Sequence, residues 1–180
     1  GIAAAQPVRW EKRFFAEFLY HERSYKISAQ IDLYEKDTKT LWDWKTAKAY
    51  AVSKRAKGGQ KPEWIAQANI GAELLRRAGY EVQRLVNIVL VKDWSDLKKN
   101  GDDHPPCPVV AVEFPIWPAA KVIGYILTKM ESHIKALETL PKCTSAETWN
   151  GGRCRRWCEA SKICDQYQSA LKTGILQEAT

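Results

Sequence analysis

Residues 25–46 are the most informative segment of the chain and read YKISAQIDLY (25–34), EKDTK (35–39) and TLWDWKT (40–46). In residues 25–34 apolar side chains alternate with polar ones, a period of two that is typical of a strand with one buried face. Residues 35–38 predict a turn and residues 40–46 the returning strand, so the segment predicts a β-hairpin. The alternation places Tyr25, Ile27, Ala29, Ile31 and Leu33 on the buried face, and Lys26, Ser28, Gln30 and Asp32 on the other.

The segments around this hairpin predict the rest of the domain. In residues 10–20 aromatic residues recur every four positions, which fits one face of a helix or of a strand; the aromatic content and the charged break at 21–24 favour a strand. Pro62 predicts the start of a helix that Gly79 ends. Residues 80–91 and 109–117 predict strands, and Pro118 opens a helix to about residue 140. This order predicts an α/β or α+β domain.

Composition limits the class of protein. The 180 residues are 45% hydrophobic and 27% charged, which suits one folded domain with a small appendage. No apolar run reaches the roughly 18–20 residues of a membrane span, and residues 1–8 do not resemble a signal peptide, so we expect a cytoplasmic protein with no membrane partner. The net charge is +7, from 28 Lys and Arg against 21 Asp and Glu. This excess favours a polyanionic partner, nucleic acid first.

The hairpin also carries acidic and basic residues in a pattern that suits metal-assisted hydrolysis. Asp43 and Lys45 are two apart on a strand and share a face, and Asp32 lies on the polar side of the partner strand. Two carboxylates can hold a hard divalent cation, while a lysine offsets charge that builds on a phosphate. The alternative is that three charged residues decorate the solvent side of a hairpin. We expect Trp42 and Trp44 to sink the other face of their strand into the core, which favours the functional interpretation.

In order and spacing, these residues resemble the PD-(D/E)XK nucleases, and among them the RecB-type exonucleases of phages and prophages. The resemblance covers roughly residues 10–94 and returns at the cysteine-rich end. It implies a restriction-endonuclease-like core, a mixed central sheet flanked by helices, that cleaves DNA with Mg²⁺ or Mn²⁺. The metal ligands would be Asp32, Asp43 and the backbone carbonyl of Trp44; Lys45 would assist the attacking water.

The resemblance also assigns supporting catalytic roles to Glu11 and Gln67, with Asn69 beside Gln67 on the helix. The sequence departs from the family's pattern at Ala29, where glycine is preferred, and at Gly71, where a tyrosine often stands. No helix bearing a His or Glu ligand precedes the hairpin. These departures motivate an alternative function, a nuclease-fold module that binds nucleic acid without cleaving it.

Four of the five cysteines fall near the end of the chain, and we expect residues 141–180 to form a metal-binding tail packed on a nuclease core of residues 1–140. An odd count without a secretion signal argues against a disulfide framework. The C-x3-C-x5-C spacing of Cys154, Cys158 and Cys164 resembles that of iron–sulfur nucleases, such as the CRISPR-associated and helicase-linked members. With Cys143 as fourth ligand it implies a [4Fe–4S] cluster; Zn²⁺ and four unliganded thiols remain alternatives. Cys107 is expected to be an unliganded loop thiol.

Basic residues follow the hairpin and accompany the tail cysteines. Contacts of Lys and Arg with phosphates, with an aromatic nearby, hold DNA without reading its sequence; solvated surfaces are the alternative. The predicted DNA-binding residues are Lys48, Lys54, Arg55, Lys57, Lys61, Arg155 and Arg156. The sequence therefore predicts a metal-dependent DNA exonuclease of recombination, repair or phage DNA processing. Its partners would be single-stranded DNA or duplex ends and a recombination or helicase protein.

Overall fold

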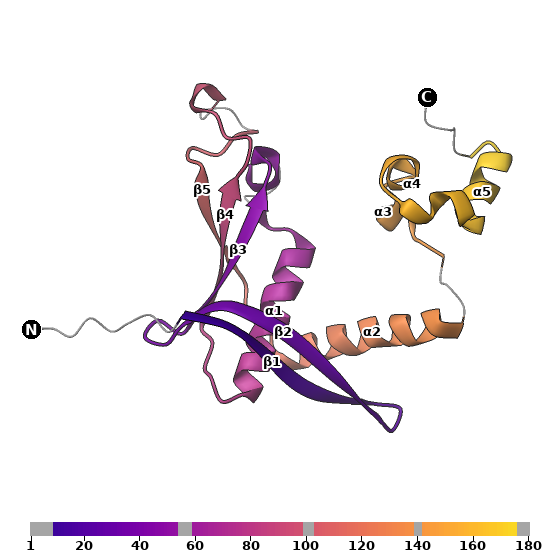
Figure 1. Cartoon of the computed structure of the whole chain (residues 1–180). Helices are drawn as coiled ribbons and strands as arrows, with labels where there is room; N and C mark the ends of the chain where they lie inside the picture. The colour runs from indigo at the N-terminus through magenta and orange to yellow at the C-terminus, as the bar shows by residue number, and fades with distance from the viewer. Residues whose placement is uncertain (1–8, 54–58, 99–102, 139–141, 176–180) are drawn as a thin grey trace, which may run out of the picture. The chain divides into compact units, whose positions relative to one another are not determined.

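The computed structural model describes residues 9–53, 59–98, 103–138 and 142–175 (Figure 1). These residues form two compact units, Gly1–Thr128 and Lys129–Thr180, and the division falls within a helix rather than at residue 140. The first unit contains a five-stranded sheet in the order β1-β2-β3-β4-β5. Its strands are β1 (Arg9–Tyr20), β2 (Arg23–Glu35), β3 (Thr40–Ala47), β4 (Arg84–Val91) and β5 (Val109–Phe114).

The sheet is mixed. β1, β2 and β3 pair antiparallel, as do β4 and β5, whereas β3 and β4 run parallel. A parallel pair needs a crossover, and this one is made by α1 (Pro62–Arg77), which follows the short 3-10 helix η1 (Ala49–Val52). After β4 come η3 (Asp96–Lys98), β5 and the long helix α2 (Ala119–Glu138). The predicted mixed sheet with flanking helices is confirmed, including the strand expected at residues 10–20.

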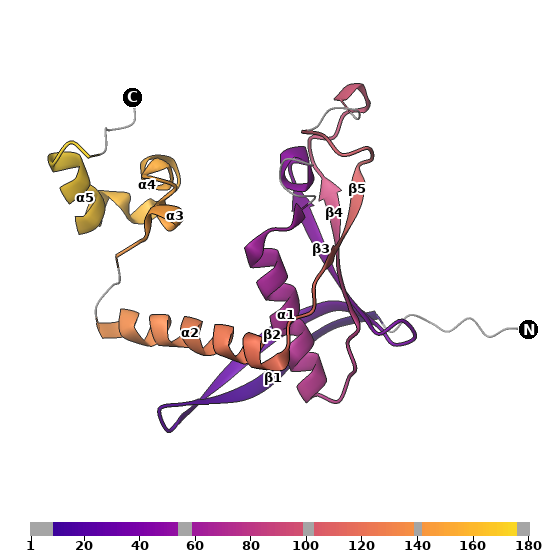
Figure 2. The ribbon, with the colours of Figure 1, turned by 180° about the vertical axis from the view of Figure 1, so that it is seen from behind.

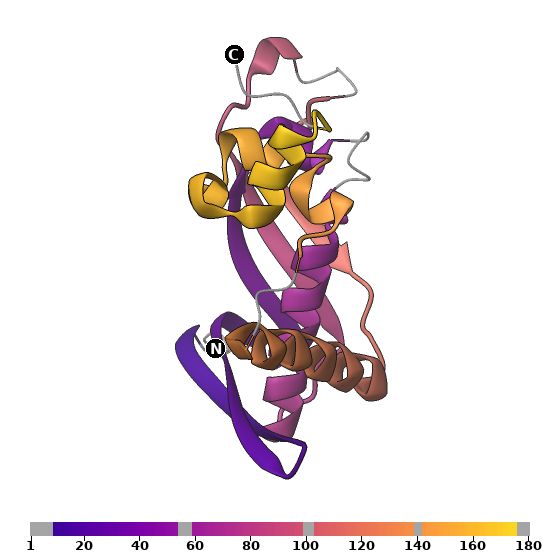
Figure 3. The same ribbon diagram turned by 90° about the vertical axis from the view of Figure 1, so that its right-hand side faces the viewer.

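Helix α1 lies along one face of the sheet (Figures 2 and 3), and the core is between them. Leu74 and Leu75 of α1, and Leu85 and Val89 of β4, expose no surface. Burying each such side chain contributes about 2 kcal/mol. At Gly71 the helix comes so close to the sheet that an added Cβ would lie 3.2 Å from Ile31 Cδ1. A Cβ would also lie 3.3 Å from Leu41 Cδ2, so any side chain at this position requires these neighbours to shift by a few tenths of an ångström.

The alternation in β2 holds only up to Ile31. Beyond it Tyr34 is buried, whereas Leu33, predicted inside, is half-buried. The shift coincides with a β-bulge, because the register with β1 moves between Arg9 (opposite Leu33) and Lys12 (opposite Ile31). Tyr34 is held by a hydrogen bond from its hydroxyl to the carbonyl of Glu81. Asp32 therefore lies where the strand changes its buried side.

The expectation for the two tryptophans of β3 is wrong. Trp44 is 54% exposed and Trp42 is half-buried. The face of β3 that α1 covers carries Leu41, Asp43 and Lys45, because the β3–α1–β4 crossover places the helix on that side. The acidic and basic side chains are thus sheltered, and an indole faces solvent.

The second unit is built from short helices, drawn in orange and yellow in Figure 1. They are α3 (Ser145–Thr148), α4 (Gly152–Arg156), η4 (Glu159–Ile163) and α5 (Asp165–Lys172). Cys143 and Gln166 connect the segment before α3 to α5: the Cys143 amide donates to Gln166 Oε1 at 2.7 Å, and Gln166 Nε2 donates to the Cys143 carbonyl at 2.8 Å. No helix among the described residues is long and apolar enough to cross a membrane.

Candidate active site

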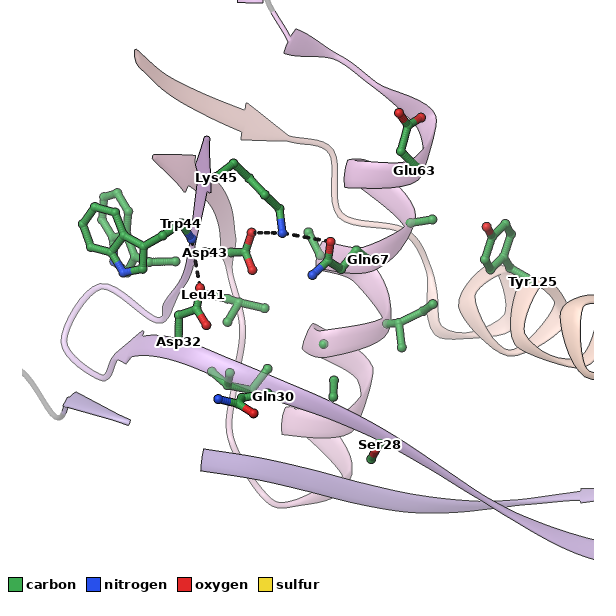
Figure 4. Close-up of a pocket in the computed structure, with 17 residues that line it drawn as sticks. Ser28, Gln30, Asp32, Leu41, Asp43, Trp44, Lys45, Glu63, Gln67 and Tyr125 are labelled. Atoms are coloured by element: carbon green, nitrogen blue, oxygen red, sulfur yellow. Dashed lines mark hydrogen bonds and ion pairs between the residues drawn. The ribbon is translucent and has the colours of Figure 1, made fainter. Parts of the chain in front are cut away.

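The candidate site opens where β3 separates from β2. The two strands pair from Glu35–Thr40 to Leu33–Trp42, and β3 then continues beside β4. Beyond this fork the β2-facing edge of β3 is hydrogen-bonded by a side chain: the Trp44 amide donates to Asp32 Oδ2 at 3.0 Å (Figure 4). Asp32 thus takes the place of a strand partner and is brought close to Asp43.

The same edge presents the backbone carbonyl that was predicted as a metal ligand. In an extended strand the N–H and C=O of one residue point to the same side. Since the Trp44 amide points at Asp32, its carbonyl also faces the fork. The Trp44 carbonyl therefore lies on the same side of β3 as Asp32, and the two carboxylates line one cavity.

Lys45 links Asp43 to α1. Its Nζ lies 2.6 Å from Asp43 Oδ2 and donates to Gln67 Oε1 at 3.0 Å (Figure 4). The side chains of Lys45 and Asp43 are only 19% and 20% exposed. Asp43 and Lys45 thus lie on one face of β3, as their spacing of two predicts. The predicted Gln67 accepts a hydrogen bond from the same Lys45 ammonium.

The environment of Asp43 disfavours the ionised form of its carboxyl group. Burial raises its pKa above the usual aspartate range and the charge of Asp32 adds to this, whereas Lys45 opposes it. Oδ2 is buried, and its polar contact among the described residues is the Lys45 ammonium, 2.6 Å away. A hard divalent cation fits such a site, because it coordinates the oxygen and neutralises both carboxylates.

A cavity of about 660 Å³ adjoins these residues, between β2, β3 and α1. Its lining includes four polar side chains to which the sequence assigned no functional role: Ser28, Gln30, Glu63 and Tyr125. Glu63 stands one helical turn before Gln67, and this spacing was a signal that could have found it. Tyr125 belongs to α2, and nothing in the sequence connects it to the hairpin.

Glu11 lies on the other side of Asp32. It falls in the β-bulge of β1, opposite Asp32, and lines a second hollow of about 730 Å³ with Asp32, Leu33 and Trp44. The predicted acid is therefore near one of the two metal-binding carboxylates, but it does not line the cavity that contains Lys45 and Gln67.

Asn69 is a scaffold residue. It is fully buried, its Nδ2 donates to the carbonyls of Ile65 (2.9 Å) and Pro115 (3.1 Å), and its Oδ1 accepts from the Trp117 amide (2.7 Å). These bonds attach α1 to the segment between β5 and α2. Asn69 thereby fixes the helix that presents Gln67.

The predicted DNA-binding residues lie on both units. In the first, Lys48 is exposed at the end of β3 and Lys61 Nζ stands 4.7 Å above the Trp64 ring. In the second, Arg155 and Arg156 are exposed on α4, and the neighbouring Trp157 is 71% exposed. The remaining three, Lys54, Arg55 and Lys57, lie outside the described residues.

The four tail cysteines, Cys143, Cys154, Cys158 and Cys164, line one cavity of about 370 Å³ in the second unit. All are free thiols. Burial raises the pKa of Cys154, and the other three thiols raise it further, so the four groups act on one another. Among the residues that the structure describes, no three His, Cys, Asp or Glu side chains meet the geometry of a metal site. Cys107 lies apart, exposed, with its thiol donating to the Val109 carbonyl.

Comparison with known proteins extends the description of the fold. No family model matches the chain, and no curated protein matches it. The crystal structure of SSO0001 is similar, with a TM-score of 0.54 at 17% sequence identity. The match covers 86% of this chain and 58% of that one, so the chain spans little more than half the length of the protein it resembles. At this identity the similarity concerns the fold alone.

Proposed function

We propose that the protein is a metal-dependent DNA nuclease, an exonuclease that hydrolyses phosphodiester bonds in DNA recombination, repair or phage DNA processing. One observation carries the proposal: Asp32 and Asp43 meet at the fork of β2 and β3, with Lys45 Nζ 2.6 Å from the buried Oδ2 of Asp43. Burial and the nearby Asp32 disfavour the ionised form of Asp43, and a cation between the two carboxylates offsets this cost. Mg²⁺ or Mn²⁺ suits a set of oxygen donors.

The carboxylates and the backbone would hold the cation. When bound, a divalent cation polarises a phosphoryl oxygen and lowers the pKa of a bound water. Asp43 must be ionised for this, and its raised pKa is overcome when a cation replaces the lost solvation. Asp32 is kept in orientation by the Trp44 amide.

Lys45 would act on the phosphate. Its ammonium is positioned by its contacts with Asp43 and Gln67. A donor fixed in this way can stabilise the negative charge that develops on the phosphate during cleavage. Gln67 is a positioning residue in this arrangement, because it acts through Lys45.

The charge of the protein suits the substrate. The net charge of +7 and the exposed Lys48, Arg155 and Arg156 favour the phosphate backbone of single-stranded DNA or of duplex ends. A half-exposed indole at Trp44, beside Asp32, offers a surface on which a base can stack.

Linear DNA with labelled ends tests the proposal. In Mn²⁺ or Mg²⁺ the wild type should release nucleotides, and Asp43→Asn should lose about 10²- to 10³-fold of this activity, the order found when one preorganised charge-stabilising contact is removed. Asp37→Asn, in the exposed turn of the same hairpin, is the matched control and should remain active. Equal rates for wild type and Asp43→Asn would refute the assignment. Salt-sensitive DNA binding without cleavage would instead identify the module that binds nucleic acid without cutting it.

A second proposal concerns the tail. We propose that Cys143, Cys154, Cys158 and Cys164 bind one metal centre, a [4Fe–4S] cluster or Zn²⁺, because the four thiols surround one cavity. Protein purified without oxygen should be brown, with absorbance near roughly 400 nm, if iron is bound, and should contain stoichiometric zinc otherwise. Cys158→Ser should lose the metal and Cys107→Ser should keep it. Four freely titrating thiols without either metal would contradict the proposal.

A further inference from the structure

A polar residue stands unpaired in the sheet next to the candidate site. Asn87 of β4 is 1% exposed, and its neighbours on the same face of the strand, Leu85 and Val89, are fully buried apolar residues. In the register of the parallel pair, Asn87 lies directly beside Asp43. It does not line the cavity of the candidate site and belongs to no motif in the sequence.

Two buried polar side-chain atoms among the described residues have no hydrogen-bond partner: Nδ2 of Asn87 and Oδ2 of Asp43. One is a donor and the other an acceptor. They belong to residues that are paired in register, on strands about 4.8 Å apart, and both side chains point to the face covered by α1. Among the residues that the structure describes, the Asn87 donor is therefore unpartnered next to a carboxylate oxygen whose polar contact is the Lys45 ammonium, 2.6 Å away.

A buried donor without a partner lowers stability, and a leucine, whose side chain branches in the same way, does not carry that cost. If Asn87 had only a packing role, the apolar residue would be the better choice. The Asn87 amide can instead donate a hydrogen bond to the Asp43 carboxylate. The terminal torsion of an aspartate has a broad minimum, so this carboxylate can turn toward the neighbouring strand.

We propose that Asn87 is a positioning residue for Asp43: its Nδ2 donates to the Asp43 carboxylate when the Lys45 ammonium leaves that carboxylate for a phosphate. This inference rests on the proposed function for the role of Asp43 as a cation ligand. Carboxylates that bind metals are commonly held by a second hydrogen bond from the protein, which fixes the oxygen that faces the metal. Asn87 supplies that bond from β4, while Lys45 and Gln67 act from the cavity side.

The first experiment uses no metal. The cycle is run on Lys45→Met protein, because the ammonium then cannot occupy the Asp43 carboxylate. Urea unfolding in EDTA is measured for Lys45→Met alone and with Asn87→Leu, Asp43→Ala or both added. With the amide coupled to the carboxylate, Asn87→Leu raises the unfolding midpoint more when Asp43→Ala is present than when it is absent, because only with Asp43 in place does it also remove a hydrogen bond. Equal gains in the two backgrounds overturn the proposal. Asn87→Ala is put through the same cycle, so that an unfolded Asn87→Leu variant does not leave the question open.

The second experiment measures Mn²⁺ binding by electron paramagnetic resonance. Asn87→Leu should weaken Mn²⁺ binding by about tenfold or more, the usual effect of losing such a partner, while its stability does not fall. Binding as tight as in the wild type overturns the proposal. A wild type that neither binds Mn²⁺ nor cleaves DNA refutes the proposed nuclease, and the metal-free cycle then decides separately whether Asn87 holds Asp43.

Discussion

Replacing Asn69 by leucine should detach α1 from the segment that follows β5. Leucine has the same number and branching of side-chain heavy atoms and is larger, so the substitution removes hydrogen bonds without leaving a cavity. Asn69 makes two bonds to that segment, to the Pro115 carbonyl and from the Trp117 amide, and one within α1 to Ile65. All are lost together.

The magnitude follows from these contacts. Each lost bond costs about 1 kcal/mol, and the buried backbone groups at Pro115 and Trp117 are left without this partner, which adds to the cost. Allowing for the apolar surface that leucine buries, we expect the free energy of unfolding to fall by about 3 kcal/mol. For a unit of this size the melting temperature drops by roughly 10 °C.

Thermal unfolding followed by circular dichroism, in EDTA, gives the result directly. Gln67→Leu is the matched control, because it exchanges the same chemical groups on the exposed side of the same helix. It should change stability by less than about 0.5 kcal/mol yet impair DNA cleavage. A melting temperature for Asn69→Leu within about 2 °C of the wild type would show that the bonds of Asn69 do not hold α1 in place.

Three further predictions concern the site and its support. Burial raises the pKa of Asp43 in the folded protein, so ionisation of this carboxyl group opposes folding. The contribution of Asp43 to stability is fully present below the ordinary pKa of 3.8 and is lost as pH rises through the raised pKa. In urea unfolding without metal, Asp43→Asn should therefore be more stable than the wild type at neutral pH and should lose this advantage in acid. Gly71→Ala should change the free energy of unfolding by less than about 1 kcal/mol, since gained helix propensity offsets contacts of 3.2 Å and 3.3 Å to Ile31 and Leu41. Gly71→Tyr should lose about 3 kcal/mol in the same measurement, and a stable tyrosine variant would refute the close approach of α1. Lys45→Met should abolish single-turnover cleavage while leaving a folded protein, and cleavage at the wild-type rate would remove Lys45 from the mechanism.

Much of the fold could be predicted from local signals. The period of two in residues 25–34, the turn that follows, and Pro62 and Gly79 at the ends of α1 are chemical features of short segments, and the structure has the corresponding elements. The pairing of Asp43 with Lys45 on one face also follows from strand geometry alone. The nuclease activity and the metal centres stay predictions.

Other features depended on how segments meet. Leu33 and Tyr34 exchange places because a bulge in β1 shifts the register, and Trp44 is exposed because α1 crosses on the opposite face of β3. Asn69 and Gln67 are two residues apart on one helix, yet one faces the β5–α2 segment and the other the cavity.

The hairpin, the order of the elements and the charged residues of the site follow from the sequence alone, because the period of side chains along a strand or helix is a local property. Three other features depend on tertiary packing: which face of β3 is sheltered, that Glu63 and Tyr125 line the cavity, and that Asn87 lies beside Asp43. These relations join residues far apart in the chain, and they are set by the parallel register of β3 and β4 and by the side on which α1 crosses, neither of which a local pattern specifies.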